Sequence, residues 1–158
     1  MVNEHDANKA LLALGITLPK VGPPQGNFEP YARVGDLLFV SGQVARWDGV
    51  VRYTGKVGSD LSIEEGKEAA RFCAMNILAH VKNACEGDLN RVKRVVRVAG
   101  LVNCLPDFGD QPKVINGCSD FLCAVFGEAG RHARIATGAS SLPSKSAVEV
   151  EALFQLHS

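Results

Sequence analysis

The sequence lacks an excess of charge of either sign. Its 158 residues include 17 Lys and Arg and 17 Asp and Glu, so the formal net charge is zero. A surface that binds nucleic acid usually shows a basic excess or a basic stripe, so we expect no nucleic acid partner. Near-neutrality also makes association between copies of the chain easier, without requiring it.

Long apolar runs and metal-binding spacings are missing as well. No stretch approaches the roughly 20 apolar residues that cross a bilayer, and the first residues form no apolar signal core. We therefore expect a cytoplasmic protein with no membrane partner. The five cysteines include no C-x-x-C pair, and the four histidines lack zinc-ligand spacing. We expect free, mostly buried thiols and no metal site.

The length favours one domain with a substantial core, and we assign residues 1–158 to it. Residues 1–20 are expected to form an N-terminal helical extension. Within it Asn3 can cap a helix that reaches Leu14, and Gly15 ends that helix. Ala10, Leu11 and Leu14 form its expected apolar stripe. The proline- and glycine-rich residues 19–27 predict a loop.

Two stretches predict the main helices. Ser62 and Glu65 match the S-x-x-E capping box, and apolar residues at helical spacing then continue to about Cys85. A second helix is expected over residues 111–126, where Gly127 ends it.

The remaining segments predict strands. Residues 31–34 and 37–40 flank a Gly-Asp turn, and residues 50–53 follow a Trp-Asp-Gly turn. Residues 92–104 alternate, with Val96 expected on the same face as Val98. Residues 133–139 and 147–156 complete the set.

This order predicts an α+β fold, with one sheet of about six strands and two main helices on one face. The other face needs cover, so we expect oligomerisation. Ala152 and Phe154, or the residues paired with them, are expected to supply apolar surface there.

Arg134 is the most informative residue of the sequence. It lies in an otherwise apolar strand, where a guanidinium is costly to bury unless an anion meets it. Its planar fork suits a carboxylate held by two parallel hydrogen bonds. Two interpretations stay open: an ion pair with a protein carboxylate such as Glu149, or the binding of an anionic ligand.

Several motifs together resemble the RidA/YjgF family, the reactive intermediate deaminases, which are also called L-PSP endoribonucleases. The resemblance covers about residues 21–155. Its motifs, in family order, are Glu29-Pro30-Tyr31, Phe39-Val40-Ser41-Gly42-Gln43, the helix with Asn116, His132-Ala133-Arg134 and Val148-Glu149-Val150-Glu151-Ala152.

The resemblance implies a chorismate-mutase-like fold, a homotrimer and three sites at the clefts between subunits. It implies hydrolysis of small 2-imino acids, such as 2-aminoacrylate or 2-iminobutanoate, to 2-oxo acids and ammonia. No cofactor is expected, because imines already hydrolyse in water. By motif position, the catalytic residues are Arg134 and Glu149, and the substrate-binding residues are Tyr31, Ser41, Asn116 and Ala136.

This sequence departs from many relatives at three positions beside Arg134. His132 replaces a small residue or proline, Ile135 replaces serine, and Ala136 replaces a frequent cysteine. The extra N-terminal helix is typical of a longer subgroup. Two other functions therefore stay open: a non-catalytic module that binds small carboxylates between subunits, and an endoribonuclease. The second is disfavoured because no pair of histidines and no basic stripe is visible.

Overall fold

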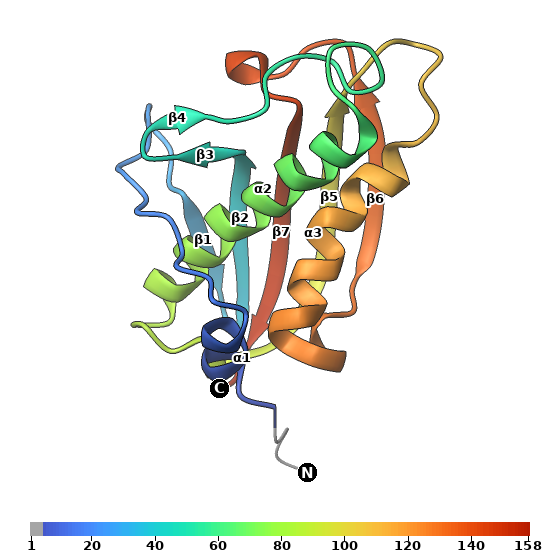
Figure 1. Cartoon of the computed structure of the whole chain (residues 1–158). Coiled ribbons are helices and arrows are strands. Elements are labelled where there is room, and N and C mark those ends of the chain that lie inside the picture. Colours follow the sequence, from blue (N-terminus) through green and yellow to red (C-terminus); the bar gives the residue numbers. More distant parts are fainter. Residues whose placement is uncertain (1–4) are drawn as a thin grey trace.

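The computed structural model describes residues 5–158 and contains a five-stranded sheet with two long helices on one face (Figure 1). The strand order is β1-β2-β7-β5-β6, and only the β5–β6 pair is parallel. The predicted α+β class is confirmed. The strands are β1 (Tyr31–Val34), β2 (Leu37–Val44), β5 (Val92–Asn103), β6 (Ala133–Ala139) and β7 (Val148–Leu156).

The expected sixth strand belongs to a separate small sheet. This sheet pairs β3 (Arg46–Trp47) with β4 (Val50–Val51) around a two-residue turn. Asp48 and Gly49 both have positive φ, 50° and 78°, which is the geometry of a tight hairpin turn. The strand predicted over residues 50–53 is wrong at its end, because Tyr53 has φ 58° and cannot continue a strand.

The two long helices are α2 (Ile63–Ala84) and α3 (Gln111–Phe126), as predicted. The capping box forms: the Glu65 N–H donates to Ser62 Oγ at 3.1 Å, and the Ser62 N–H donates to the Glu65 carboxylate at 2.8 Å. Gly117 brings α3 close to α2, because a Cβ atom there would collide with the backbone of Lys67. With one side of α3 packed against α2 at Gly117, another side of α3 faces β6.

The N-terminal helix α1 (Ala7–Ala13) is shorter than predicted. Asp6 caps it by accepting the Lys9 N–H at 3.1 Å, and Asn3 lies outside the described residues. The expected apolar stripe is wrong at Leu14, which is 45% exposed, whereas Leu11 is buried. Gly15 ends the helix as expected, with φ 67°. Three short 3-10 helices, η1 (Leu89–Arg91), η2 (Gly127–Gly130) and η3 (Pro143–Lys145), join the other elements.

The core lies between α2, α3 and the helix-bearing face of the sheet. Strand β5 enters this core through a bulge between Val95 and Arg97, so the simple alternation fails there. Val95 is fully buried and Val96 only partly, which reverses the predicted side for Val96. No helix within residues 5–158 is long and apolar enough to cross a membrane.

The opposite face of the sheet, which we call the open face, carries no helix from the described part of the chain (Figure 1). Ala152 and Phe154 are buried in the core on the helix-bearing face, so the expectation for these two residues is wrong. Their partners on β2, Val40 and Leu38, are buried on the same face, so the expectation is wrong for the partners too. Phe39, which pairs with Leu153, lies on the open face instead and is 46% exposed. On β6, Ile135 is 50% exposed. Apolar side chains therefore lie on a face that this chain leaves uncovered.

Candidate functional site

Arg134 points from the edge strand β6 toward α3. Its Nη1 donates to Asn116 Oδ1 at 2.9 Å and to Ser119 Oγ at 3.2 Å, and its Nη2 donates to the Pro112 carbonyl at 3.4 Å. These acceptors are all neutral. Within residues 5–158 no carboxylate lies at ion-pair distance from Arg134. The charge of the guanidinium is therefore not compensated by a carboxylate of these residues, and its remaining N–H groups can bind an anion from outside the chain.

A second layer of hydrogen bonds fixes Ser119. Its Oγ lies 2.9 Å from His132 Nε2, and His132 Nδ1 lies 2.6 Å from the Gly130 carbonyl oxygen. A carbonyl only accepts, so Nδ1 carries the proton and Nε2 accepts from the Ser119 hydroxyl. Ser119 Oγ is then free to accept from Arg134. Burial lowers the pKa of His132, and the nearby Arg134 cation lowers it further, so the ring is neutral at pH 7.

Sequence reasoning identified Arg134 and Asn116 but missed Ser119. The signal was present, because Ser119 follows Asn116 by three residues and therefore shares its side of the helix. The sequence singled out His132 only as a departure from many relatives. The structure brings these four residues together between the middle of α3 and the start of β6.

Cys118 is the thiol nearest in chain position to this cluster, and it is not a nucleophile. Complete burial raises the pKa of the Cys118 thiol to about 12, although the Arg134 charge acts in the opposite direction. The thiol is therefore protonated at neutral pH. All five cysteines are unpaired, and within residues 5–158 no group of His, Cys, Asp and Glu side chains could hold a metal ion.

Glu149 lies on the open face, against Gly42. A Cβ atom at position 42 would lie 2.5 Å from Glu149 Oε1, so only glycine leaves room for the carboxylate as it stands. The pKa of Glu149 is raised, first by burial and then by the charge of Glu151. Glu149 makes no ion pair within the described chain, whereas Glu151 lies 3.5 Å from Arg97. Glu149 therefore has the environment of a carboxyl group that can hold a proton.

Tyr31 and Ser41 lie together near the other edge of the sheet. The Tyr31 ring packs 6.4 Å from the His80 ring, centroid to centroid, on the helix-bearing face. The Ser41 hydroxyl donates to the Glu29 carbonyl at 2.8 Å. No histidine or aspartate bonds Ser41 in the described chain, so its hydroxyl is not activated as a nucleophile.

The six expected site residues do not all meet within one chain. Tyr31, Val40, Ala152, Val98 and Arg134 form one row across the five strands, so Tyr31 and Arg134 lie on the same face but about 19 Å apart by strand spacing. Glu149 lies on the opposite face, about 10 Å along the strands and about 10 Å across them from Arg134.

Ala136 is the next residue of β6 after Arg134 that faces the helices. It pairs with Gly100, and a Cβ atom on Gly100 would lie 2.5 Å from the side chain of Ile115. Because β6 is an edge strand, its outer row of N–H and C=O groups has no strand partner. The Ala136 side chain packs against the core, two residues along β6 from Arg134.

Comparison with known protein families matches residues 8–156 to the family described as "YjgF/chorismate_mutase-like, putative endoribonuclease". This chain belongs to the YjgF family. The match spans nearly the whole described chain. It confirms the family and the chorismate-mutase-like fold that the motifs had indicated.

Three similar proteins cover almost all of this YjgF-family chain. Protein TCP17 of Trypanosoma cruzi is 45% identical over 93% of this chain and 92% of its own length. The structure of Atu1372 from Agrobacterium tumefaciens, a protein of unknown function, is 42% identical with TM-score 0.90, over 96% of this chain and 92% of that one. A Shewanella oneidensis MR-1 protein is 37% identical with TM-score 0.92, over 96% and 100%.

Proposed function

We propose that this protein hydrolyses small 2-imino acids, such as 2-aminoacrylate in its imine form or 2-iminobutanoate, to 2-oxo acids and ammonia. The observation that supports this most is the Arg134 guanidinium, which three neutral α3 acceptors hold in place and which no carboxylate within residues 5–158 neutralises. A fixed, unneutralised guanidinium suits a small carboxylate. Held there, the substrate presents its imine carbon in one orientation.

The hydrolysis needs one water and one proton donor. Water adds to the imine carbon and forms a carbinolamine, and the C–N bond then breaks as the nitrogen gains a proton. Glu149 suits the proton transfer, because its raised pKa keeps part of it protonated nearer neutral pH than an ordinary glutamate. After giving its proton to nitrogen, the carboxylate takes one back from the added water. The outer backbone groups near Ala136 can stabilise the polar intermediate.

The site is proposed to lie between subunits of a homotrimer. Arg134 and Tyr31 occupy opposite edges of one sheet, and Glu149 faces away from both, so one chain cannot gather them. A cyclic arrangement places the β6 edge of one chain beside the β1–β2 edge of the next, which joins Arg134 and Asn116 to Tyr31 and Ser41 of the neighbour. The exposed apolar residues of the open face would be buried in the same arrangement.

A non-catalytic carboxylate-binding role has one observation in its favour. The Cys118 thiol is protonated and Ser41 bonds only backbone, so the site residues include no activated nucleophile. Such a module would bind 2-oxo acids and leave imines unchanged. The endoribonuclease role has less support, because a chain of zero net charge shows no basic excess to attract a polyanion.

One assay separates these functions. Purified protein is added to freshly generated 2-iminobutanoate, and the release of 2-oxobutanoate is followed. We expect acceleration that Arg134→Gln abolishes and that Arg131→Gln, at an exposed arginine of the same segment, leaves unchanged. Binding of 2-oxobutanoate without turnover would establish the binding module instead. An RNA-cleaving activity that stays with the protein through stringent purification would establish the ribonuclease.

A further inference from the structure

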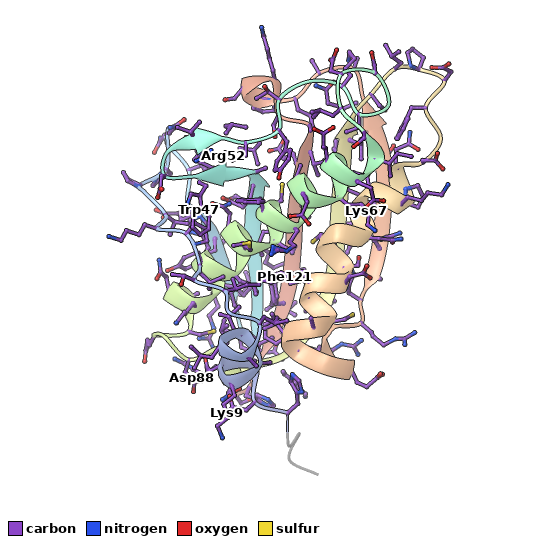
Figure 2. All side chains as sticks on the ribbon, viewed as in Figure 1. Lys9, Trp47, Arg52, Lys67, Asp88 and Phe121 are labelled. Atoms are coloured by element: carbon purple, nitrogen blue, oxygen red, sulfur yellow. The ribbon has the colours of Figure 1, made fainter. Side chains whose placement is uncertain are left out.

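A second cavity lies away from the residues discussed above. It has a volume of about 690 Å³, opens to the surface, and is lined by the β3–β4 hairpin, α2 and the segment that follows α1. Figure 2 shows Trp47 and Arg52 at this hairpin. The volume is typical of small-molecule sites. None of the six expected site residues lines the cavity, so it is a separate feature of the fold.

Aromatic rings form one wall of this cavity. Trp47 and Phe72 meet edge to face, with ring centroids 5.9 Å apart and planes at 82°, and Tyr53 meets Phe72 at 5.9 Å and 59°. All three side chains are partly buried. Rings in these relative orientations offer both faces and edges to another ring. The wall therefore suits a flat aromatic group better than a flexible aliphatic chain.

Two guanidinium groups give the cavity its charge. Arg52 makes no ion pair within residues 5–158. Arg71 has a 3.9 Å contact with the exposed Glu68, and its guanidinium carbon lies 6.0 Å from the centre of the Phe121 ring. An exposed pair at that distance neutralises little. Among residues 5–158, no aspartate or glutamate lines the cavity. The local charge is therefore positive in a protein of zero net charge, which favours an anionic ligand.

The backbone of Tyr53 supports the same interpretation. Its φ of 58° lies in the left-handed region, which is unusual for a bulky aromatic residue and costs on the order of 1 kcal/mol. The Ala147 N–H holds this conformation by donating to the Tyr53 carbonyl at 2.9 Å. A strained residue is kept in place only when its surroundings hold it firmly. Here the strain directs the tyrosine ring toward Phe72 and the cavity.

We propose that this cavity binds a small aromatic carboxylate. The ring of the ligand lies among Trp47, Tyr53 and Phe72, and its carboxylate receives hydrogen bonds from Arg52 and Arg71. The aromatic wall selects for the ring and the two guanidinium groups select for the charge. This site does not depend on the imine-hydrolysing function, because the two share no residue.

The only tryptophan of the chain lines this cavity, so its fluorescence reports on the site alone. Phenylacetate, which combines one ring with one carboxylate, is titrated into the assembled protein. We expect a saturable change in tryptophan emission. Benzyl alcohol lacks the charge and acetate lacks the ring, and each should bind at least about tenfold more weakly. A linear response to phenylacetate, or equal affinity for benzyl alcohol, would overturn the proposal.

Variants locate the binding. Arg52→Gln changes an exposed side chain and should weaken phenylacetate binding about fivefold to tenfold, and Arg71→Gln should do the same. Lys20→Gln removes an exposed charge from the N-terminal segment outside this cavity and should leave binding unchanged. Arg134→Gln should abolish imine hydrolysis and leave phenylacetate binding intact. Binding that survives Arg52→Gln, or that disappears with Arg134→Gln, would show that the ligand sits elsewhere.

Discussion

Arg134 and Glu149 lie on opposite faces of one sheet, two strands apart. Arg134 faces α3, and Glu149 faces outward beside Gly42. A ligand held by the first cannot touch the second within one chain. If both act on one substrate, they must come from different copies of the protein, and this requirement can be tested directly.

Mixed assemblies should recover activity from two inactive variants. Arg134→Gln and Glu149→Gln are each expected to be inactive alone. A cyclic trimer that contains both variants has one site, of three, in which an intact Arg134 meets an intact Glu149. Random mixing of equal amounts should therefore restore about a quarter of the wild-type rate. The rate of 2-oxobutanoate release after co-expression measures this. Mixtures that stay inactive would place both residues in the site of a single subunit.

Gly42→Ala should reduce activity with little loss of stability. The added Cβ atom collides with Glu149 Oε1, which is the mobile end of a side chain and can move aside. We expect kcat to fall and Tm to change by no more than a few degrees. Gly22→Ala is the matched control, because a Cβ atom there meets nothing within 4 Å. Equal activity of Gly42→Ala and wild type would show that the position of the Glu149 carboxylate is unimportant.

Ser119→Ala should weaken substrate binding more than turnover. The change removes one hydrogen bond from Arg134 Nη1 and leaves the bond to Asn116. A lost bond to a charged group corresponds to about 1.5 kcal/mol, or an increase in KM of roughly tenfold. Ser119→Thr retains the hydroxyl and should retain most of the affinity. Steady-state kinetics distinguish KM from kcat, and an unchanged KM in Ser119→Ala would contradict the positioning role.

Stability should fall as the pH drops below about 6.5, the ordinary pKa of histidine. Burial lowers the pKa of both His80 and His132 in the folded chain. Between the lowered folded pKa and 6.5, the unfolded chain binds more protons, so acid favours unfolding in this window, whereas stability is full above it. Urea unfolding from pH 8 to pH 5 measures the effect.

The matched variants for this pH effect are His132→Gln and His157→Gln. His132→Gln should flatten the dependence in part, whereas the exposed His157→Gln should not. Equal slopes in wild type and His132→Gln would remove His132 as a cause. The stability of this variant at pH 8 reports separately on the hydrogen bonds that His132 makes.

Local patterns predicted the elements well because each depends on neighbouring residues. The capping box at Ser62, the alternation along β7 and the stop at Gly127 are all short-range signals, and the structure contains the elements they indicate. Errors arose where distant contacts intervene. Because of the β5 bulge, Val95 lies in the core in place of the predicted Val96. The hydrogen bond from the Ala147 N–H holds Tyr53 in a conformation that ends the predicted strand early.

The sequence alone determined the order of strands and helices along the chain. It also determined the family and the identity of the conspicuous arginine. Only the tertiary structure decided what surrounds that arginine. Gly117 lets α3 approach α2, and this approach turns Asn116 and Ser119 toward Arg134 from residues 15 to 18 positions away. The pairing of β7 with β5 and β2 likewise placed Glu149 on the face of the sheet opposite to Arg134. Pairings between segments far apart in the chain depend on the packing of whole elements, which no local pattern encodes.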